Sequence, residues 1–181
     1  DPVTSEDLAH VISAADIRRR VADMATRIAE DYGSTPPVLV GVLNGAVQFM
    51  MDLLAALPAS VAERINYDFI VASSYVGTER RNRVEVLNGG LAVDVRGRPA
   101  LVVEGIVDSG YTAVAVRDYL LVAGAQRVDI CTLLDKPSRR VIDVELRYRG
   151  FEIDDVFVVG YGMDADQRYR SLRDIGVLTQ S

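Results

Sequence analysis

Cysteine, histidine and long hydrophobic runs are scarce in this sequence, and each shortage excludes a class of protein. The 181 residues include one cysteine, Cys131, so no disulfide can form within the chain. The single histidine, His10, lies in a polar stretch, which argues against a histidine-based triad or a histidine-rich metal site. No hydrophobic run could span a bilayer, and we identify no signal peptide. We therefore expect a cytoplasmic enzyme without a membrane partner.

Basic residues are in the minority. The chain has 20 Lys and Arg residues against 26 Asp and Glu residues, a formal net charge of −6. This balance disfavours nonspecific binding to nucleic acid, although a phosphorylated substrate would still need a local basic patch. The length suits a single domain over 1–181 with one sizeable core. Cys131 lies inside the hydrophobic run 128–134, and we interpret it as a small buried side chain rather than a nucleophile.

Hydrophobic spacing predicts strands that alternate with helices. A capping box at Ser13 and Asp16 opens a helix that ends at Gly33. The same reasoning predicts helices over 46–57 and 112–123, and strands over 38–43, 65–72, 84–87, 91–95, 100–107, 128–134, 141–148 and 156–161. The polar segment 73–83 predicts a mobile loop, and 84–87 with 91–95 predicts a hairpin or two edge strands. This alternation indicates an α/β fold with a mostly parallel sheet.

One strand-to-helix turn carries the clearest chemical signal. The hydrophobic run that begins at Leu101 ends in Asp108, Ser109 and Gly110, and Thr112 opens the next helical pattern. Such a turn presents free N–H groups and the positive end of a helix to an anion. The segment has neither the lysine of a P-loop nor the three-glycine dinucleotide fingerprint. We interpret it as a monophosphate site, with an ordinary strand-to-helix turn as the alternative.

This turn and several ordered segments resemble a known family. Residues 103–112 (VEGIVDSGYT) resemble the phosphoribosyl-pyrophosphate signature of type I phosphoribosyltransferases. The segments 133–137, 150–153, 157–164 and 169–172 are similar to the hypoxanthine-guanine phosphoribosyltransferase family, and 42–46 and 68–75 fit it in the same order. The resemblance extends from about Ile12 to Leu178. It implies a type I phosphoribosyltransferase fold, with helices flanking the sheet and a small hood built from the two termini.

The resemblance also implies an activity. Members of this family move the 5-phosphoribosyl group of phosphoribosyl pyrophosphate to hypoxanthine or guanine, which yields IMP or GMP and pyrophosphate in purine salvage. It implies Mg²⁺ as cofactor and a homodimer or homotetramer. Two alternatives stay open: the same chemistry on xanthine or a modified purine, and a non-catalytic regulator that senses a nucleotide or binds RNA.

Site residues carried over by the resemblance fall into two groups. Asp108 matches the general base, or proton acceptor, near the purine ring. On the sugar side, Glu104 matches an acid near the ribose hydroxyls and the metal, and the 5-phosphate loop comprises Ser109, Gly110, Tyr111 and Thr112. The pyrophosphate contacts comprise Leu43, Asn44, Gly45 and Arg170, and Ser74 and Tyr75 open a flexible lid over about 74–84.

On the purine side, Lys136 matches the donor to the exocyclic oxygen of the base, and Phe157 matches a stacking ring. Val158 matches a residue that reads the purine edge through its backbone, and Asp164 matches a purine-side residue that also binds the metal. Without the resemblance, Lys136 reads as a solvated lysine before a proline turn, and Phe157 and Val158 read as strand core.

The chain departs from the family pattern at three places. Gly105 stands where a second acid is usual beside Glu104, and Asn44 stands where a basic residue often follows the leucine. The lid segment 76–82 replaces a small, serine-rich pattern with a charged one. We expect these departures to affect the rate and the substrate range more than the fold.

Overall fold

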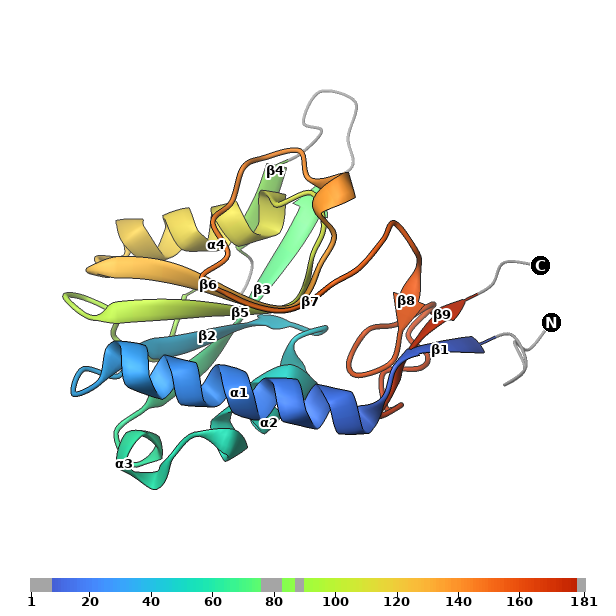
Figure 1. The fold of residues 1–181 in the computed structure, drawn as a ribbon. Helices are drawn as coiled ribbons and strands as arrows, with labels where there is room; N and C mark the ends of the chain where they lie inside the picture. The colour runs from blue at the N-terminus through green and yellow to red at the C-terminus, as the bar shows by residue number, and fades with distance from the viewer. Residues whose placement is uncertain (1–7, 76–82, 87–89, 179–181) are drawn as a thin grey trace.

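A mostly parallel sheet forms the centre of the molecule. The computed structural model describes residues 8–75, 83–86 and 90–178 (Figure 1). Six strands lie in the order β4-β3-β2-β5-β6-β7. Their bounds are β2 Val38–Leu43, β3 Asn66–Tyr75, β4 Arg83–Val86, β5 Pro99–Val107, β6 Arg127–Asp135 and β7 Tyr148–Glu152. All the neighbours pair in parallel except β3 and β4. The predicted α/β fold with a mostly parallel sheet is confirmed.

Helices cover both faces of this sheet. Helices α1 (Ala14–Tyr32) and α2 (Val47–Ala56) lie on one face and α4 (Tyr111–Val122) on the other, with the short α3 (Ala59–Ala62) after α2 (Figure 1). The predicted N-cap is present, because the Asp16 N–H donates to Ser13 Oγ at 3.1 Å. The Asp16 carboxylate accepts the Ser13 hydroxyl at 2.7 Å instead of the backbone N–H that completes a capping box. Gly33, with φ +51°, ends α1 as expected.

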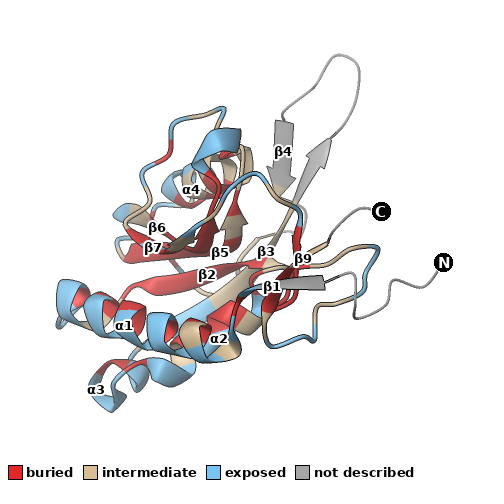
Figure 2. Ribbon diagram, turned by 45° about the vertical axis from the view of Figure 1, so that its right-hand side comes forward, coloured by how far each residue is buried: buried red, intermediate tan, exposed pale blue. Residues whose placement is uncertain are grey.

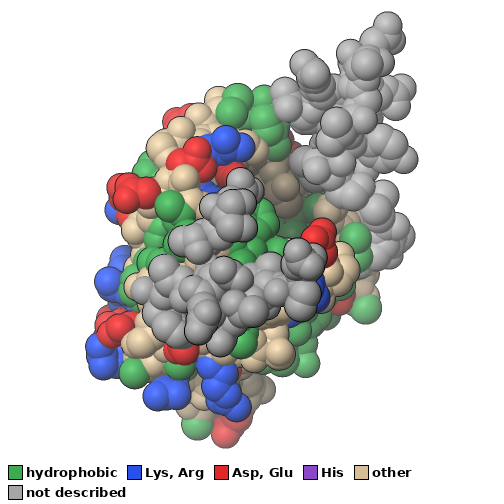
Figure 3. Space-filling view, turned by 90° about the vertical axis from the view of Figure 1, so that its right-hand side faces the viewer, with side chains coloured by type: hydrophobic (Ala, Val, Ile, Leu, Met, Phe, Trp, Pro, Cys, Tyr) green, Lys and Arg blue, Asp and Glu red, His purple; other side chains and the backbone are tan. Residues whose placement is uncertain are grey.

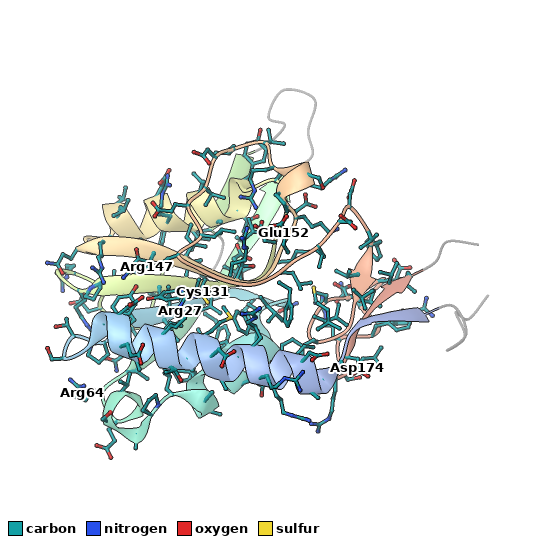
Figure 4. The ribbon with its side chains drawn as sticks, viewed as in Figure 1. Arg27, Arg64, Cys131, Arg147, Glu152 and Asp174 are labelled. Atoms are coloured by element: carbon teal, nitrogen blue, oxygen red, sulfur yellow. The ribbon has the colours of Figure 1, made fainter. Side chains whose placement is uncertain are left out.

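The core follows from this layering, since the central strands are buried on both faces (Figure 2). One hydrophobic cluster lies under α1 and α2, and the second lies under α4. Cys131 of β6 is fully buried within the first cluster, and burial raises the pKa of its thiol (Figure 4). This environment confirms the small buried side chain that the sequence predicted.

A smaller antiparallel sheet joins the two ends of the chain. Its strands are β1 (Leu8–Ile12), β9 (Ile175–Leu178) and β8 (Val158–Val159), in the order β1-β9-β8. It stands beside the main sheet and corresponds to the expected hood (Figure 1). Asp174, just before β9, accepts the backbone N–H of Ala14 at 2.5 Å, at the start of α1 (Figure 4). No helix in the described ranges combines the length and the apolar character that a membrane span needs.

The hairpin predicted from 84–87 and 91–95 is wrong in its pairing. Strand β4 pairs with the end of β3, and residues 91–95 form no strand. The Asp68 carboxylate explains this, because it accepts the backbone N–H groups of Ala92 at 2.6 Å and Val93 at 3.3 Å. Those donors are therefore used by a side chain rather than by a neighbouring strand. Part of the loop expected over 73–83 is strand, and 76–82 lies outside the described residues.

The strand predicted over 141–148 is also wrong. Residues 140–147 are irregular, and β7 begins only at Tyr148. The backbone N–H groups of Val141 and Ile142 both donate to the carbonyl oxygen of Ser109 at 3.0 Å. This segment therefore closes against the turn after β5 instead of joining the sheet. The strand predicted over 156–161 is reduced to the two residues of β8.

Candidate active site

Three parallel strands end at the same edge of the sheet, and the loops that follow them meet there. Strands β2, β5 and β6 are neighbours, and their loops begin at Asn44, Asp108 and Lys136. Open α/β sheets bind ligands at this edge. A cavity of about 370 Å³ opens there, and its lining is Asn44, Gly45, Ile106, Asp108, Lys136, Phe157, Val158, Met163, Asp164 and Arg170. We call it the large cavity.

Lys136 is the only lysine in the chain, and it lines the large cavity. The residue is only 7% exposed, and its backbone N–H donates to the Val107 carbonyl at 3.0 Å. No carboxylate among the described residues pairs with its ammonium group. The interpretation of a solvated lysine is therefore wrong, and a donor-only group faces the space in which a ligand would lie.

Asp108 and Phe157 supply an acceptor and an exposed ring to the same cavity. The Asp108 side chain is 43% exposed, and its Oδ1 accepts Arg139 Nε at 3.3 Å. Phe157 is 54% exposed, so its ring is not part of the core. The neighbouring Val158 is buried in the hydrophobic cluster under α1 and α2, as the strand-core alternative expected.

A second, smaller cavity of about 90 Å³ lies at the N-terminus of α4. Gly110 is the N-cap of this helix at φ +92°, a conformation that favours glycine, and no side chain caps the helix. The first N–H groups of α4 therefore remain available to an anion. The lining includes Glu104, Asp108, Ser109, Gly110 and Thr112. We call it the small cavity.

Glu104 is the unusual group of the small cavity. It is 7% exposed, and its Oε1 is buried without a hydrogen-bond partner among the described residues. Burial raises the pKa of this carboxyl to about 8. An unpaired buried carboxyl is costly for folding, and such groups are concentrated at functional sites.

Asp164 and Arg170 form an ion pair at the rim of the large cavity. Arg170 Nη2 lies 2.8 Å from Asp164 Oδ1, and Arg170 Nη1 donates to the Gly162 carbonyl at 2.7 Å. The backbone N–H of Gln167 donates to Asp164 Oδ2 at 2.8 Å. The pair is less than one-third exposed, so both side chains are held in place and remain within reach of a ligand.

The loop after β2 is packed tightly at Gly45. A Cβ atom on Gly105 would lie 2.7 Å from the Gly45 carbonyl oxygen, and a Cβ atom on Gly162 would lie 2.6 Å from it. Two glycines from distant parts of the chain thus allow the loop to approach β5 and the turn at 162. The peptide bond between Leu43 and Asn44 is cis.

Comparison with known proteins identifies the family and the fold. The family model for the phosphoribosyl transferase domain matches residues 13–166. The hypoxanthine phosphoribosyltransferase of Escherichia coli is 43% identical over 169 residues, 92% of each chain. The hypoxanthine-guanine phosphoribosyltransferase of Streptococcus pneumoniae is 36% identical over 170 residues, 94% of this chain and 92% of that one. A solved hypoxanthine phosphoribosyltransferase structure from Staphylococcus aureus matches with a TM-score of 0.89 at 34% identity, over 99% of this chain and 96% of that one.

The chain belongs to the hypoxanthine phosphoribosyltransferase family. This confirms the resemblance drawn from the ordered motifs.

The two cavities gather most of the site residues that the family resemblance suggested. The large cavity takes Asn44, Gly45, Asp108, Lys136, Phe157, Val158, Asp164 and Arg170, and the small cavity takes Glu104, Ser109, Gly110 and Thr112 together with Asp108. Leu43 and Tyr111 line neither cavity. Leu43 directly precedes Asn44 of the large cavity, and Tyr111 stands between Gly110 and Thr112 of the small cavity. Ser74 and Tyr75 lie at the end of β3, and their side chains are outside the described part. The roles of all these residues remain predictions.

Asp135 and Arg140 are two residues of this region that sequence reasoning missed. Arg140 Nε donates to the Asp108 carbonyl at 3.0 Å, and its guanidinium also pairs with the Asp135 carboxylate. Arg140 is 32 positions from Asp108, and no periodicity links the two. The only signal in the sequence for either residue is the position of Asp135, an acid directly before the lysine matched to purine recognition.

Proposed function

We propose that this protein transfers the 5-phosphoribosyl group of phosphoribosyl pyrophosphate to hypoxanthine or guanine, with release of pyrophosphate, in purine salvage. The observation that carries the proposal is one large cavity that combines a donor-only Lys136, the acceptor Asp108 and the exposed ring of Phe157. The small cavity at the N-terminus of α4 lies next to it and shares Asp108. The names of the related enzymes support the same substrates.

Base selection follows from hydrogen-bond chemistry. The Lys136 ammonium can only donate, so it favours the carbonyl oxygen of a 6-oxopurine over the 6-amino group of adenine. The Phe157 ring would stack on the purine, and the backbone of Val158 would read its edge.

Asp108 takes the role of proton acceptor. As a ring nitrogen of the base forms its bond to C1 of the sugar, the bond from C1 to the pyrophosphate oxygen breaks. The proton that the ring loses passes to the Asp108 carboxylate. The two cavities hold base and sugar at a fixed separation, and this positioning accounts for a large share of the rate enhancement.

The phosphates are assigned to two places, and a lid is assigned over the reacting atoms. Ser109, Gly110, Tyr111 and Thr112 bind the 5-phosphate at the N-terminus of α4. The pyrophosphate is bound by Leu43, Asn44, Gly45 and Arg170. Arg170 forms an ion pair with Asp164 in the structure, and part of this pairing is replaced by bonds to phosphate oxygens when the substrate binds. Ser74 and Tyr75 begin a lid over about 74–84 that closes over the reacting atoms and excludes water.

Mg²⁺ is the proposed cofactor, with Glu104 and Asp164 as its protein ligands. Glu104 offers a buried carboxyl oxygen without a partner, and Asp164 offers an accessible carboxylate. The described residues contain no group of three or more metal-ligating side chains. Mg²⁺ is often held by one or two carboxylates and the substrate phosphates, so these residues fit. The ion would neutralise charge on the phosphates.

We also propose that residues 1–181 act as one domain, that the protein forms a homodimer or homotetramer, and that it acts in the cytoplasm. Exposed apolar side chains support self-association: Val47 and Met51 of α2 are each 38% exposed, and Tyr67 of β3 is 47% exposed. On the face seen in Figure 3, acidic and basic side chains of the described residues are interspersed. Among the side chains coloured in that view, there is no continuous basic surface of the kind an RNA-binding regulator needs.

An initial-rate assay tests the proposal, with hypoxanthine, guanine, xanthine and adenine in parallel. Each reaction contains phosphoribosyl pyrophosphate, with and without Mg²⁺. We expect Mg²⁺-dependent turnover of hypoxanthine or guanine and slow reaction of adenine. Turnover restricted to xanthine would shift the assignment to that alternative. A folded protein with no turnover of any base would refute the enzymatic proposal.

A further inference from the structure

The loop after β6 and the turn after β5 supply residues for the two sides of the proposed site, and they lie against each other. We call the contact between these two segments the seam. The loop after β6 supplies Lys136, and the turn after β5 supplies Asp108 and Gly110. Backbone hydrogen bonds join them: Lys136 N–H to the Val107 carbonyl, and the Val141 and Ile142 N–H groups to the Ser109 carbonyl, all at 3.0 Å. The purine side and the sugar side of the site therefore share one structural unit.

One side chain crosses this seam. Arg140 is 18% exposed, and its Nε donates to the backbone carbonyl of Asp108 at 3.0 Å. A terminal nitrogen of the same guanidinium pairs with Asp135, whose side chain is only 4% exposed. Asp135 immediately precedes Lys136. The guanidinium thus connects the residue before the proposed base donor to the backbone of the proposed proton acceptor.

The fit around Arg140 is close. A Cβ atom on Gly110 would meet Arg140 Cδ at 3.1 Å and the Ile142 carbonyl at 2.8 Å. The stem of Arg140 therefore packs against the turn that forms the small cavity, while its head group binds the Asp108 carbonyl of that turn and the Asp135 carboxylate at the end of β6. A planar guanidinium holds two acceptors in fixed directions, whereas an ammonium group is a point charge on a flexible stem.

Asp135 has a second cationic partner that does not cross the seam. Arg149 Nη1 lies 3.1 Å from Asp135 Oδ2 and 3.1 Å from Glu152 Oε2, and its side chain is 49% exposed. Among the described residues, Arg149 has no hydrogen bond to the turn after β5. It therefore provides a matched control, because it balances the same carboxylate without linking the loops.

We propose that Arg140 and Asp135 are positioning residues that hold Lys136 and the Asp108–Gly110 turn at the separation that transfer requires. The proposal rests on the function proposed above. It explains why a nearly buried acid stands next to the base-recognising lysine. It also predicts that the bridge couples the binding of base to the binding of phosphoribosyl pyrophosphate, since a shift of one loop moves the other.

The test compares Arg140→Lys, Asp135→Asn and the control Arg149→Gln with the wild type. For each variant, kcat and the KM values of hypoxanthine and phosphoribosyl pyrophosphate are measured, together with the melting temperature. Arg140→Lys keeps the charge beside Asp135 and loses the two-ended bridge. We expect it to melt close to the wild type and to lose roughly 10- to 100-fold in kcat/KM for both substrates. Arg149→Gln should stay within about twofold, as is usual for a half-exposed ion pair.

Two further comparisons separate positioning from simple charge balance. In the wild type, the KM of hypoxanthine should change between limiting and saturating phosphoribosyl pyrophosphate, and in Arg140→Lys this dependence should weaken. The double variant Arg140→Lys/Asp135→Asn should be no worse than the more impaired single variant, because both changes remove one bridge. If Arg140→Lys does not fold, Asp135→Asn provides the test, because it keeps the shape of the side chain. The same kcat and KM values are then compared with those of the wild type.

Wild-type kinetics in Arg140→Lys would overturn the proposal, since charge alone would then suffice. An equal loss in Arg149→Gln would also overturn it, because the charge balance of Asp135 would then be the cause. Failure of the proposed function has a different signature: the wild type itself would form no nucleotide. In that case the affinity for inosine monophosphate, whose base and 5-phosphate are the groups assigned to the two loops, still reports on the bridge. Equal affinity in the wild type and Arg140→Lys would refute it.

Discussion

Gly105 offers the sharpest test of how the site is packed, because sequence and structure lead to opposite expectations for it. The family resemblance implies an acid at this position, so introducing one with Gly105→Asp should improve sugar binding if the missing carboxylate is what matters. In the structure, a Cβ atom here would lie 2.7 Å from the Gly45 carbonyl oxygen and 3.1 Å from its carbon. We therefore expect Gly105→Asp and Gly105→Ala both to be impaired.

The size of the effect follows from the displacement required. Ordinary contact begins at 3.4 Å, so the loop at Gly45 or strand β5 must retreat by the difference from 2.7 Å, about 0.7 Å. Gly162 crowds the same carbonyl oxygen, which leaves the loop little freedom to move. Overpacking of this kind costs about 1–3 kcal/mol of folding free energy. A misplacement approaching 1 Å in a site costs roughly 10- to 100-fold in kcat/KM.

The assay measures kcat/KM for phosphoribosyl pyrophosphate and the free energy of unfolding in urea. Gly41→Ala is the matched control: its Cβ would also lie 2.7 Å from a neighbour, but that neighbour is the Phe69 ring, away from the loop. It should lose stability while keeping activity per folded molecule. Wild-type or higher activity in Gly105→Asp would refute the packing argument and favour the missing carboxylate.

Three other predictions follow from the site and the core. Lys136→Ala should reduce the preference for hypoxanthine over adenine by about 1.5–3 kcal/mol, the usual contribution of a hydrogen bond to a charged group, and an unchanged ratio of kcat/KM values would remove Lys136 from base recognition. Burial raises the pKa of Glu104 from 4.5 to about 8, so between these pH values the carboxyl keeps its proton in the folded protein and loses it in the unfolded chain. The free energy of unfolding should therefore fall as the pH rises through this range, by up to about 1.4 kcal/mol per pH unit. Glu104→Gln should flatten that slope in urea titrations without Mg²⁺, and parallel pH curves for the two proteins would contradict the burial argument. Cys131, the only thiol, should resist a thiol reagent until denaturant is added, because burial raises its pKa; rapid labelling of the native protein would show that the core opens.

Much of the fold was predictable because local signals and tertiary packing agree. The N-cap at Ser13, the buried run of β5 and the glycine turn at Gly110 each specify one local structure, and all three are present in the protein. The same turn carries the phosphate chemistry, so the part of the site built from one continuous segment was predictable as well. The residues of the large cavity come from separate loops, and only the family resemblance brought them together beforehand.

The wrong strand predictions lie where groups distant in the sequence accept hydrogen bonds from the backbone N–H groups. Residues 91–95 and 141–148 both have apolar patterns typical of strands. Their N–H groups are instead used by the Asp68 side chain and by the Ser109 carbonyl. The bridge from Asp135 through Arg140 to Asp108 and the crowding of Gly45 by Gly105 and Gly162 likewise depend on contacts between remote segments. No local periodicity encodes such contacts.

The most direct test of the central claim is the initial rate of IMP formation from hypoxanthine and phosphoribosyl pyrophosphate, measured side by side for the wild type and Asp108→Asn. The account predicts that the wild type turns over and that Asp108→Asn, matched for folded concentration, loses roughly 100-fold or more in kcat, as expected for the loss of a general base. It also predicts little change in the KM for phosphoribosyl pyrophosphate. Equal rates for the two proteins would show that the large cavity does not carry the chemistry assigned to it.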